Sequence, residues 1–190
     1  MKNLETQLQL YFGIAQQEEL QNISSFFNHT TLKKGDYLVE YGKKCTTMCF
    51  IQSGLLRVFA NSENKEVTQW IATPDYFITD LAAFLFETPS RWSIQALVDT
   101  DIYIIDKKKY NQINKILPEW NEFERYFLTQ CFTMMENRIF SHLSMSAEER
   151  YTAFYENNKA LFNEVPLQYI ASMLGMTPET FSRIRRKYHQ

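Results

Sequence analysis

The sequence predicts an α+β fold: an antiparallel β-roll, a long helix and an all-helical C-terminal region. Three observations lead to this prediction. Short apolar runs punctuated by glycine fill residues 31–105, an uninterrupted helical pattern follows Pro118, and the segment from Ser146 to Gln190 has helical periodicity throughout. Short strands separated by turns every 8 to 12 residues or so are typical of a jelly-roll-like double-stranded β-helix.

The N-terminal half is expected to begin with helices and continue as strands. Leu20, Ile23 and Phe27 recur at helical spacing, so the first 30 residues are interpreted as helical. Strands are then expected over residues 37–41, 48–52, 55–60, 66–72, 93–97 and 101–105. We expect three domains: 1–117 as the β-roll with its N-terminal helices, 118–145 as a long helix, and 146–190 as a helical domain.

Composition excludes several classes of protein. Hydrophobic residues make up 45% of the chain and charged residues 22%, which is ordinary for a soluble globular protein. No apolar run approaches the roughly 18 to 20 residues that span a bilayer, and the first five residues contain no apolar signal-peptide stretch. We therefore expect a cytoplasmic protein with no membrane partner.

Catalytic and metal-binding patterns are missing from the sequence. It contains no Ser/His/Asp order and no phosphate loop, so we predict that the protein is not an enzyme. Cys45, Cys49 and Cys131 are odd in number and lack metal-ligand spacing, so no metal site is expected. We interpret all three as small, buried or half-buried hydrophobic residues.

The long helix carries more apolar surface than one small domain normally covers. Asp106 is a suitable N-cap for a helix over 107–117, and Pro118 suits the first position of a second helix that runs to about Met145. One of its two apolar stripes has 4-3-4 spacing and consists of Leu128, Phe132, Met135 and Ile139. We expect this stripe to meet a second subunit; the alternative is a single helix packed into one core.

The C-terminal region contains the most specific pattern. Ser146 and Glu149 form a capping box that starts a new helix. Further on, Gly175 is placed to end one helix in a left-handed conformation, Thr177 to cap the next, and Pro178 to occupy its first position. Two short helices joined in this way predict a helix-turn-helix.

The second of these helices is expected to read DNA. Phe181, Ile184 and Tyr188 fall on one face, which should point inward. Glu179, Arg183 and Arg186 fall at i, i+4 and i+7 on the opposite face, where Arg suits guanine and Glu suits cytosine in the major groove. Phosphate contacts are expected from the remaining polar side chains around the helix, which are Thr177, Thr180, Ser182, Arg185 and Lys187.

Together these segments resemble the Crp/Fnr family of regulators, over roughly Thr31 to the end of the chain. Gly35, Gly42 and Gly54, with six and then eleven residues between them, are similar to the glycine frame of the cyclic-nucleotide-binding β-roll. Residues 76–81 through Arg91 resemble its phosphate-binding cassette, and residues 169–183 (YIASMLGMTPETFSR) resemble its helix-turn-helix. The resemblance implies a homodimer that binds two-fold DNA sites, with the β-roll as a sensor domain, and makes RNA polymerase a candidate partner.

The cassette departs from the pattern of the family members that bind cyclic AMP. Those members have Gly-Glu-Leu at the start of a short helix, followed by Arg-Ser/Thr-Ala, whereas this chain has Thr79-Asp80-Leu81 and Arg91-Trp92-Ser93. The resemblance places an effector site at Ile78, Thr79, Asp80, Leu81, Arg91, Trp92 and Ser93. We expect an effector other than cyclic AMP, or none, and an ion pair of Arg91 with Asp80 is a structural alternative.

A further departure from the family concerns the β-wing that often accompanies the helix-turn-helix. It is not evident here, because residues 146–165 have a helical pattern. The alternative function is a nucleotide-sensing module that acts on a protein partner.

Overall fold

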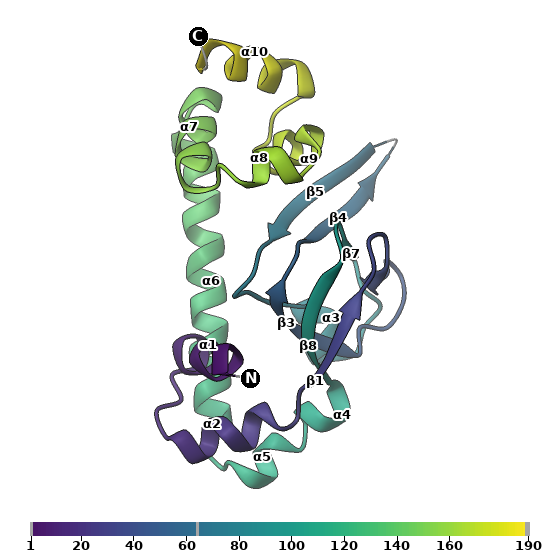
Figure 1. The fold of residues 1–190 in the computed structure, drawn as a ribbon, viewed down its shortest axis with the longest axis vertical. Coiled ribbons are helices and arrows are strands. Elements are labelled where there is room, and N and C mark those ends of the chain that lie inside the picture. Colours follow the sequence, from purple (N-terminus) through teal and green to yellow (C-terminus); the bar gives the residue numbers. More distant parts are fainter. Residues whose placement is uncertain (1, 64, 189–190) are drawn as a thin grey trace. The chain divides into compact units, whose positions relative to one another are not determined.

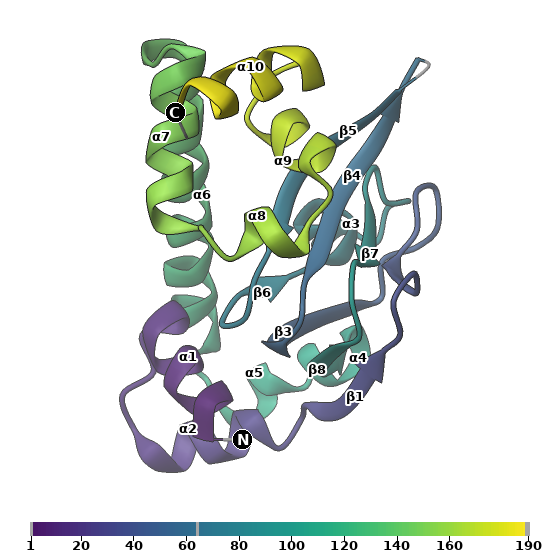
Figure 2. The ribbon, with the colours of Figure 1, turned by 45° about the horizontal axis from the view of Figure 1, so that its top comes forward.

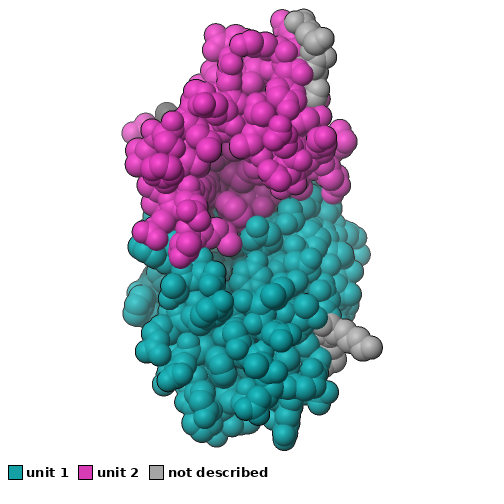
Figure 3. Space-filling model, turned by 90° about the vertical axis from the view of Figure 1, so that its left-hand side faces the viewer, with its two compact units in different colours: residues 1–58, 72–132 teal, residues 59–71, 133–190 magenta. Residues whose placement is uncertain are grey.

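The structure, a computed structural model, describes residues 2–63 and 65–188 and has the predicted α+β fold (Figure 1). It divides into two compact units (Figure 3): residues 1–58 with 72–132, and residues 59–71 with 133–190. The division between the units lies within the long helix, and residues 59–71 group with the C-terminal helices.

Two four-stranded sheets form the β-roll. One has the order β1-β8-β3-β6, with bounds Asn28–Leu32, Thr100–Asp106, Thr47–Ser53 and Phe77–Ile78. The other has the order β2-β7-β4-β5, with bounds Tyr37–Val39, Ser93–Ala96, Leu56–Ser62 and Lys65–Ala72. The pairs β1–β8, β3–β8, β3–β6 and β2–β7 are antiparallel. Figure 2 shows β4 and β5 as one long hairpin.

Gly54 is needed where the chain turns from β3 into β4. Its φ is +92°, and a Cβ atom added there would lie 2.7 Å from Thr100 Cα and 2.8 Å from the Asp99 carbonyl oxygen. Both atoms belong to the backbone and cannot move aside easily. The third glycine of the predicted frame therefore has a steric cause as well as a conformational one.

The N-terminal region is helical only in part. Helices α1 (Lys2–Phe12) and α2 (Gln17–Ser24) agree with expectation, but β1 begins at Asn28, inside the segment interpreted as helical. This strand lies at the edge of its sheet and pairs with β8. Its sequence, Asn-His-Thr-Thr-Leu, has no continuous apolar run, which is why the periodicity did not reveal it.

The helices after the β-roll are more broken than predicted. Asp106 caps α4 (Lys107–Tyr110) by accepting a hydrogen bond from the Lys109 N–H at 2.8 Å, as expected. A turn separates α4 from α5 (Ile113–Ile116), so residues 107–117 are not one helix. The long helix α6 (Trp120–Ser144) begins two residues after Pro118, which lies in the preceding turn.

Aromatic rings hold the first turns of α6 inside the first unit. The Phe12 ring of α1 stacks on Trp120 at 5.2 Å and on Phe127 at 4.5 Å between ring centroids. The buried Tyr110 hydroxyl donates a hydrogen bond to Glu124 at 2.6 Å. Burial and this bond both raise the pKa of Tyr110, so the phenol stays protonated.

The second unit contains α7 (Ala147–Asn157), α8 (Leu161–Glu164), α9 (Leu167–Met173) and α10 (Pro178–Tyr188). The capping box predicted at α7 is present: Ser146 Oγ accepts from the Glu149 N–H, and Glu149 accepts from the Ser146 N–H. Tyr151 is fully buried and contacts the rings of Phe162 and Phe181. Residues 146–188 contain helices and turns but no strand, so the described part of this region has no β-wing.

Candidate nucleic-acid interface and sensor cassette

The turn between α9 and α10 has the geometry that its residues predict. Gly175 has φ +68°, the Met176 N–H donates to the Ala171 carbonyl at 2.9 Å, and the Gly175 N–H donates to Ser172 at 3.0 Å. This pair of bonds closes α9 in the manner of a Schellman motif. Thr177 then caps α10 by accepting from the Thr180 N–H at 3.3 Å, and Pro178 is the first helical residue.

Helix α10 has a buried face and an exposed face. Phe181 and Ile184 are buried, as expected. Tyr188 was also expected to point inward; its ring contacts Tyr151 and Tyr155, yet it remains 40% exposed because it lies in the last turn. The other predicted DNA contacts are solvent-exposed except for Thr180, which is half-buried; the exposed ones are Thr177, Glu179, Ser182, Arg183, Arg185, Arg186 and Lys187.

Two acidic residues shape the charge of this surface. A hydrogen bond from its own backbone N–H and another from the Thr177 hydroxyl hold the pKa of Glu179 below its usual value. Glu179 therefore remains an ionised acceptor beside Arg183. Glu148 of α7 forms an ion pair with Lys187, 3.1 Å between Nζ and Oε2, so this lysine is already partly neutralised. Spacing along the sequence could not reveal a partner 39 residues away.

Helices α6 and α7 each hold the turn of the α9–α10 pair through an arginine that sequence reasoning missed. Arg138 Nη2 donates to the Met173 carbonyl at 3.2 Å, and Arg150 of α7 donates through Nε to the Leu174 carbonyl at 3.0 Å. Both acceptors lie at the C-terminal end of α9, where carbonyl groups lack helical partners. Arg150 also donates to the Met145 carbonyl at 2.6 Å, which ties the end of α6 to the same place.

The β4–β5 hairpin contributes to the same unit. The Arg138 guanidinium lies over the Trp70 ring at 5.2 Å from its centroid, and the Thr68 N–H donates to Ser172 Oγ of α9 at 2.9 Å. Burial lowers the pKa of Arg138, and its Nη1 atom is buried without a hydrogen-bond partner among the described residues. Strand β5 thus reaches the first helix of the pair directly.

The apolar stripe that is predicted to form the subunit interface lies along α6 and is largely exposed to solvent. Phe132 is 64% exposed, Ile139 56% and Met135 40%, whereas Leu128 is half-buried. Leu143, one helical turn beyond Ile139, is 81% exposed. Large apolar side chains in a row on one helix are unusual on the surface of a monomer.

Both carboxylate oxygens of Asp80, in the cassette, accept hydrogen bonds from neighbouring residues of its own chain. It caps α3 (Leu81–Phe86) by accepting from the Ala83 N–H at 3.2 Å. Its other oxygen accepts from the Ser90 hydroxyl at 2.7 Å and from the Arg91 N–H at 3.1 Å. The carboxylate is buried, so it serves the fold of the cassette.

The remaining cassette residues each contact different neighbours in the β-roll. The exposed Arg91 guanidinium lies 5.1 Å from the Trp92 ring centroid and forms no ion pair with Asp80, so the salt bridge weighed from the sequence is wrong. The Ser93 hydroxyl accepts from the Tyr41 N–H, and the Thr79 hydroxyl donates to the Thr47 carbonyl. Ile78 of β6 pairs with Cys49 of β3, and Leu81 is half-buried.

The cysteines are buried or half-buried, as interpreted from the sequence. Cys45 and Cys49 are buried and Cys131 is half-buried, with all three thiols free. Burial raises the pKa of Cys131 to about 11, which keeps the thiol protonated and unreactive at neutral pH. None of the described helices has both the length and the apolarity needed to cross a bilayer.

Comparison with known proteins identifies the fold. The family model for the cyclic nucleotide-binding domain matches residues 29–115. No curated protein sequence matches the chain. FixK2 from Bradyrhizobium japonicum is similar in structure, with a TM-score of 0.72 and 14% identity over 86% of this chain and 84% of that one.

Two other solved structures extend the comparison. CLP from Xanthomonas campestris, described as a c-di-GMP responsive global regulator, has a TM-score of 0.67 and 10% identity over 92% of both chains. The regulatory domain of Toxoplasma gondii PKA, solved with cAMP, has a TM-score of 0.54 and 18% identity over 59% of this chain and 43% of that one. Residues 29–115 thus match the cyclic nucleotide-binding domain, and the chain shares the fold of FixK2 and CLP, as the resemblance in sequence predicts.

Proposed function

We propose that this protein is a sequence-specific DNA-binding transcription regulator of the Crp/Fnr type that binds a two-fold operator as a homodimer. One observation carries the proposal: Glu179, Arg183 and Arg186 are all exposed on the face of α10 opposite its buried side. Arg pairs bidentately with guanine and Glu accepts from cytosine, so this face has the chemistry that reads base edges.

Charge supports the same function. The chain as a whole has a formal net charge of −2, yet four basic residues occur within five positions from Arg183 to Lys187. Concentrated positive charge at one end of a nearly neutral protein favours nucleic acid at that end. In this function α9 lies across the backbone and α10 enters the major groove.

The homodimer follows from the exposed stripe on α6. Parallel copies of this helix would bury Phe132, Met135 and Ile139 against their counterparts. A two-fold dimer presents two copies of α10 to a two-fold operator, about one helical turn of DNA apart.

The effector, if there is one, is inferred to be a molecule other than cyclic AMP. In the family pattern a Glu at the place of Asp80 holds the ribose hydroxyl. Here the shorter carboxylate accepts hydrogen bonds from Ala83, Ser90 and Arg91. Arg91, the expected phosphate ligand, lies over Trp92.

Selection of bound sequences from a random DNA pool is the direct test. A recovered consensus with inverted half-sites about 10 base pairs apart is expected. An Arg183→Ala, Arg186→Ala double variant is the matched control and should recover no consensus. Enrichment that is identical for the two proteins would contradict the proposal.

A second candidate function is a sensing module that acts on a protein partner. The fold likeness to a PKA regulatory domain favours it, although that likeness covers only 59% of the chain. An electrophoretic mobility shift with the selected DNA separates the two candidates. A shifted band at nanomolar protein is expected for the regulator, and no shift at any concentration is expected for the module.

A further inference from the structure

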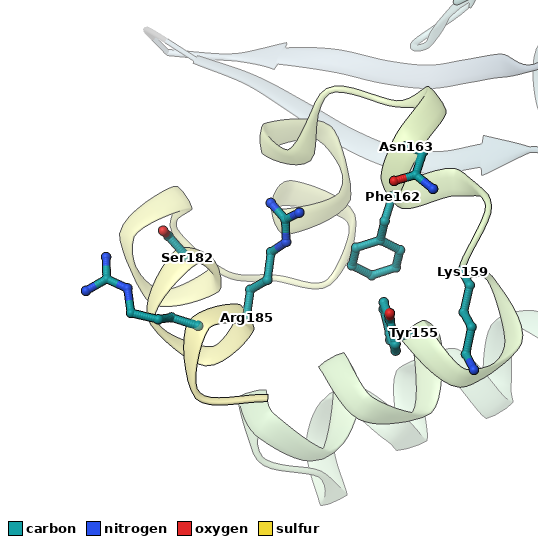
Figure 4. Close-up of a pocket in the computed structure, with 7 residues that line it drawn as sticks. Tyr155, Lys159, Phe162, Asn163, Ser182 and Arg185 are labelled. Carbon is teal, nitrogen blue, oxygen red and sulfur yellow. The ribbon is translucent and has the colours of Figure 1, made fainter. Parts of the chain in front are cut away.

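A cavity of about 520 Å³ opens beside α10, between the end of α7, the short helix α8 and one flank of α10 (Figure 4). Its walls consist of Tyr155, Lys159, Phe162, Asn163, Ser182, Arg185 and Arg186. Figure 4 shows Arg185 and Lys159 on opposite walls, with the rings of Phe162 and Tyr155 between them. The two aromatic rings form the apolar part of the cavity wall, and the charged and polar side chains lie around them.

Positive charge in this cavity is not compensated. Lys159, Arg185 and Arg186 contribute three cations, and no lining residue is acidic. None of the three forms an ion pair with a described carboxylate. Lys187, on the other flank of the same helix, differs because Glu148 neutralises it. Uncompensated cations that converge from α10 and from the turn between α7 and α8, with the Ser182 hydroxyl and the Asn163 amide as neutral donors, suit an anion with several acceptor oxygens.

The position of the cavity on α10 indicates which anion it would receive. An α-helix with its side chains is about 10 to 12 Å wide and the major groove is about 12 Å wide, so a helix in the groove has phosphate backbone along each flank. Glu179, Arg183 and Arg186 mark the face toward the bases. Ser182 and Arg185, three residues apart, lie on the flank that borders the cavity.

We propose that this cavity receives backbone phosphates of one operator strand, and that Lys159 and Asn163 are DNA contacts outside the helix-turn-helix. The inference rests on the proposed function and extends it to α7 and α8. In this arrangement α8 supplies, beside α10, backbone contacts of the kind that a β-wing makes in winged domains. Lys159 is a lone lysine 16 residues before Gly175 of the turn, which is why no motif revealed it.

Fluorescence-anisotropy titrations at several salt concentrations test the proposal. Lys159→Ala should weaken binding by roughly three- to tenfold on operator and scrambled duplexes alike, and lower the salt slope by about 0.9, the value for one phosphate contact. Lys65→Ala removes an equal charge from an exposed position outside the cavity, in β5, and should leave both quantities unchanged. Because Lys159 and Lys65 are both exposed, neither variant should change the melting temperature.

A neutral-backbone scan assigns the contact to the phosphate. Single methylphosphonate substitutions along each strand should weaken the wild-type protein at one or two positions beside the bases read by α10. Lys159→Ala should be insensitive at those positions and retain wild-type sensitivity elsewhere. Equal sensitivity of both proteins at every position would overturn the proposal.

The outcomes separate this inference from the function on which it rests. Operator binding that Arg183→Ala abolishes and Lys159→Ala leaves unchanged at every salt concentration would overturn the cavity assignment and leave the regulator intact. No DNA binding by the wild-type protein would overturn both. Binding of inorganic phosphate that Lys159→Ala abolishes, without any effect of this variant on DNA affinity, would assign the cavity to a small anion and overturn the proposal.

Discussion

The four basic side chains of α10 are expected to differ in what they do on DNA. Arg183 has no acidic partner among the described residues, whereas Lys187 is paired with Glu148. An exposed ion pair contributes little to stability. It does, however, reduce the charge that Lys187 can offer to a phosphate. The structure therefore modifies the expectation from sequence that Lys187 contacts the backbone.

Arg183→Ala should cost about 1 to 3 kcal/mol on the operator and relax the preference at one base pair in each half-site. Lys187→Ala should change binding less, and Glu148→Gln should strengthen binding to operator and scrambled DNA alike, because it frees the lysine. Anisotropy titrations on both duplexes measure all three. Equal losses on both duplexes for Arg183→Ala would mean that this residue meets phosphate and not a base.

Glu149 makes the second unit sensitive to acid. Hydrogen bonds from the Ser146 N–H and hydroxyl hold the pKa of Glu149 below its usual value in the folded state. A depressed folded pKa gives stability that is present above the unfolded pKa and is lost as pH falls through the folded one. Glu149→Gln keeps the amide oxygen as acceptor but does not titrate.

Chemical denaturation of both proteins from pH 6 to pH 2.5 checks this. The wild type should be the more stable at pH 6. Its advantage over Glu149→Gln should begin to fall near about pH 4.3, where a free Glu carboxyl titrates, and be lost as pH falls through the lower folded-state pKa. An advantage that is constant across the range would show that the charge on Glu149 is irrelevant to the cap.

At the scale of elements, periodicity and capping chemistry predicted most of what the structure contains. The capping box at Ser146, the caps at Asp106 and Thr177 and the left-handed Gly175 are all confirmed. Each depends on residues within a few positions of one another, which a sequence displays directly. The strands expected at residues 48–52 and 101–105 are present as β3 and β8, because their apolar runs are continuous.

The sequence did not reveal the elements and contacts whose partners are far away along the chain. Strand β6 has only two residues and exists because Phe77 and Ile78 pair with β3. Arg138, Arg150 and Lys159 act on groups from other helices, or border a cavity with them, and no local pattern marks them. The three hydrogen-bond donors to Asp80 could not be derived from the sequence, because Ser90 and Arg91 lie ten and eleven residues away.

The exposed apolar stripe of α6 predicts a dimer, and negative charges introduced into that stripe should dissociate it. Met135→Glu combined with Ile139→Glu places four like charges in a two-fold seam, and size-exclusion chromatography with light scattering should then show a monomer. Asn137→Glu, an exposed position between them, is the control and should remain dimeric. A dimer in the double variant would contradict the seam.

At the scale of the whole molecule, the β-roll has the glycine frame of a nucleotide-binding domain, while its cassette carboxylate accepts hydrogen bonds within its own loop. Gly54 is sterically required by Thr100 and serves the fold whatever the domain binds. We therefore expect the fold without cyclic AMP binding, since a fold does not by itself fix a ligand.

Isothermal calorimetry with cyclic AMP should accordingly show no binding tighter than about 10 μM, equivalent to roughly −7 kcal/mol. Asp80→Ala should not improve binding; it should lower the melting temperature, since the Ser90 hydroxyl and the Arg91 N–H lose their acceptor. A dissociation constant well below that limit for the wild type would show that the Thr79-Asp80-Leu81 sequence still forms a cyclic AMP site.

The two arginines at the end of α9 join the helix pair α9–α10 to the C-terminal turns of α6. Arg138 lies on α6 itself, and Arg150 donates both to the Met145 carbonyl at the end of α6 and to the Leu174 carbonyl. The second unit therefore holds its last two helices through side-chain bonds to backbone carbonyls as well as through its aromatic core. Because those carbonyls remain as acceptors when either side chain is changed, the orientation of α9 and α10 depends on the two guanidinium groups and not on the residues that form the turn.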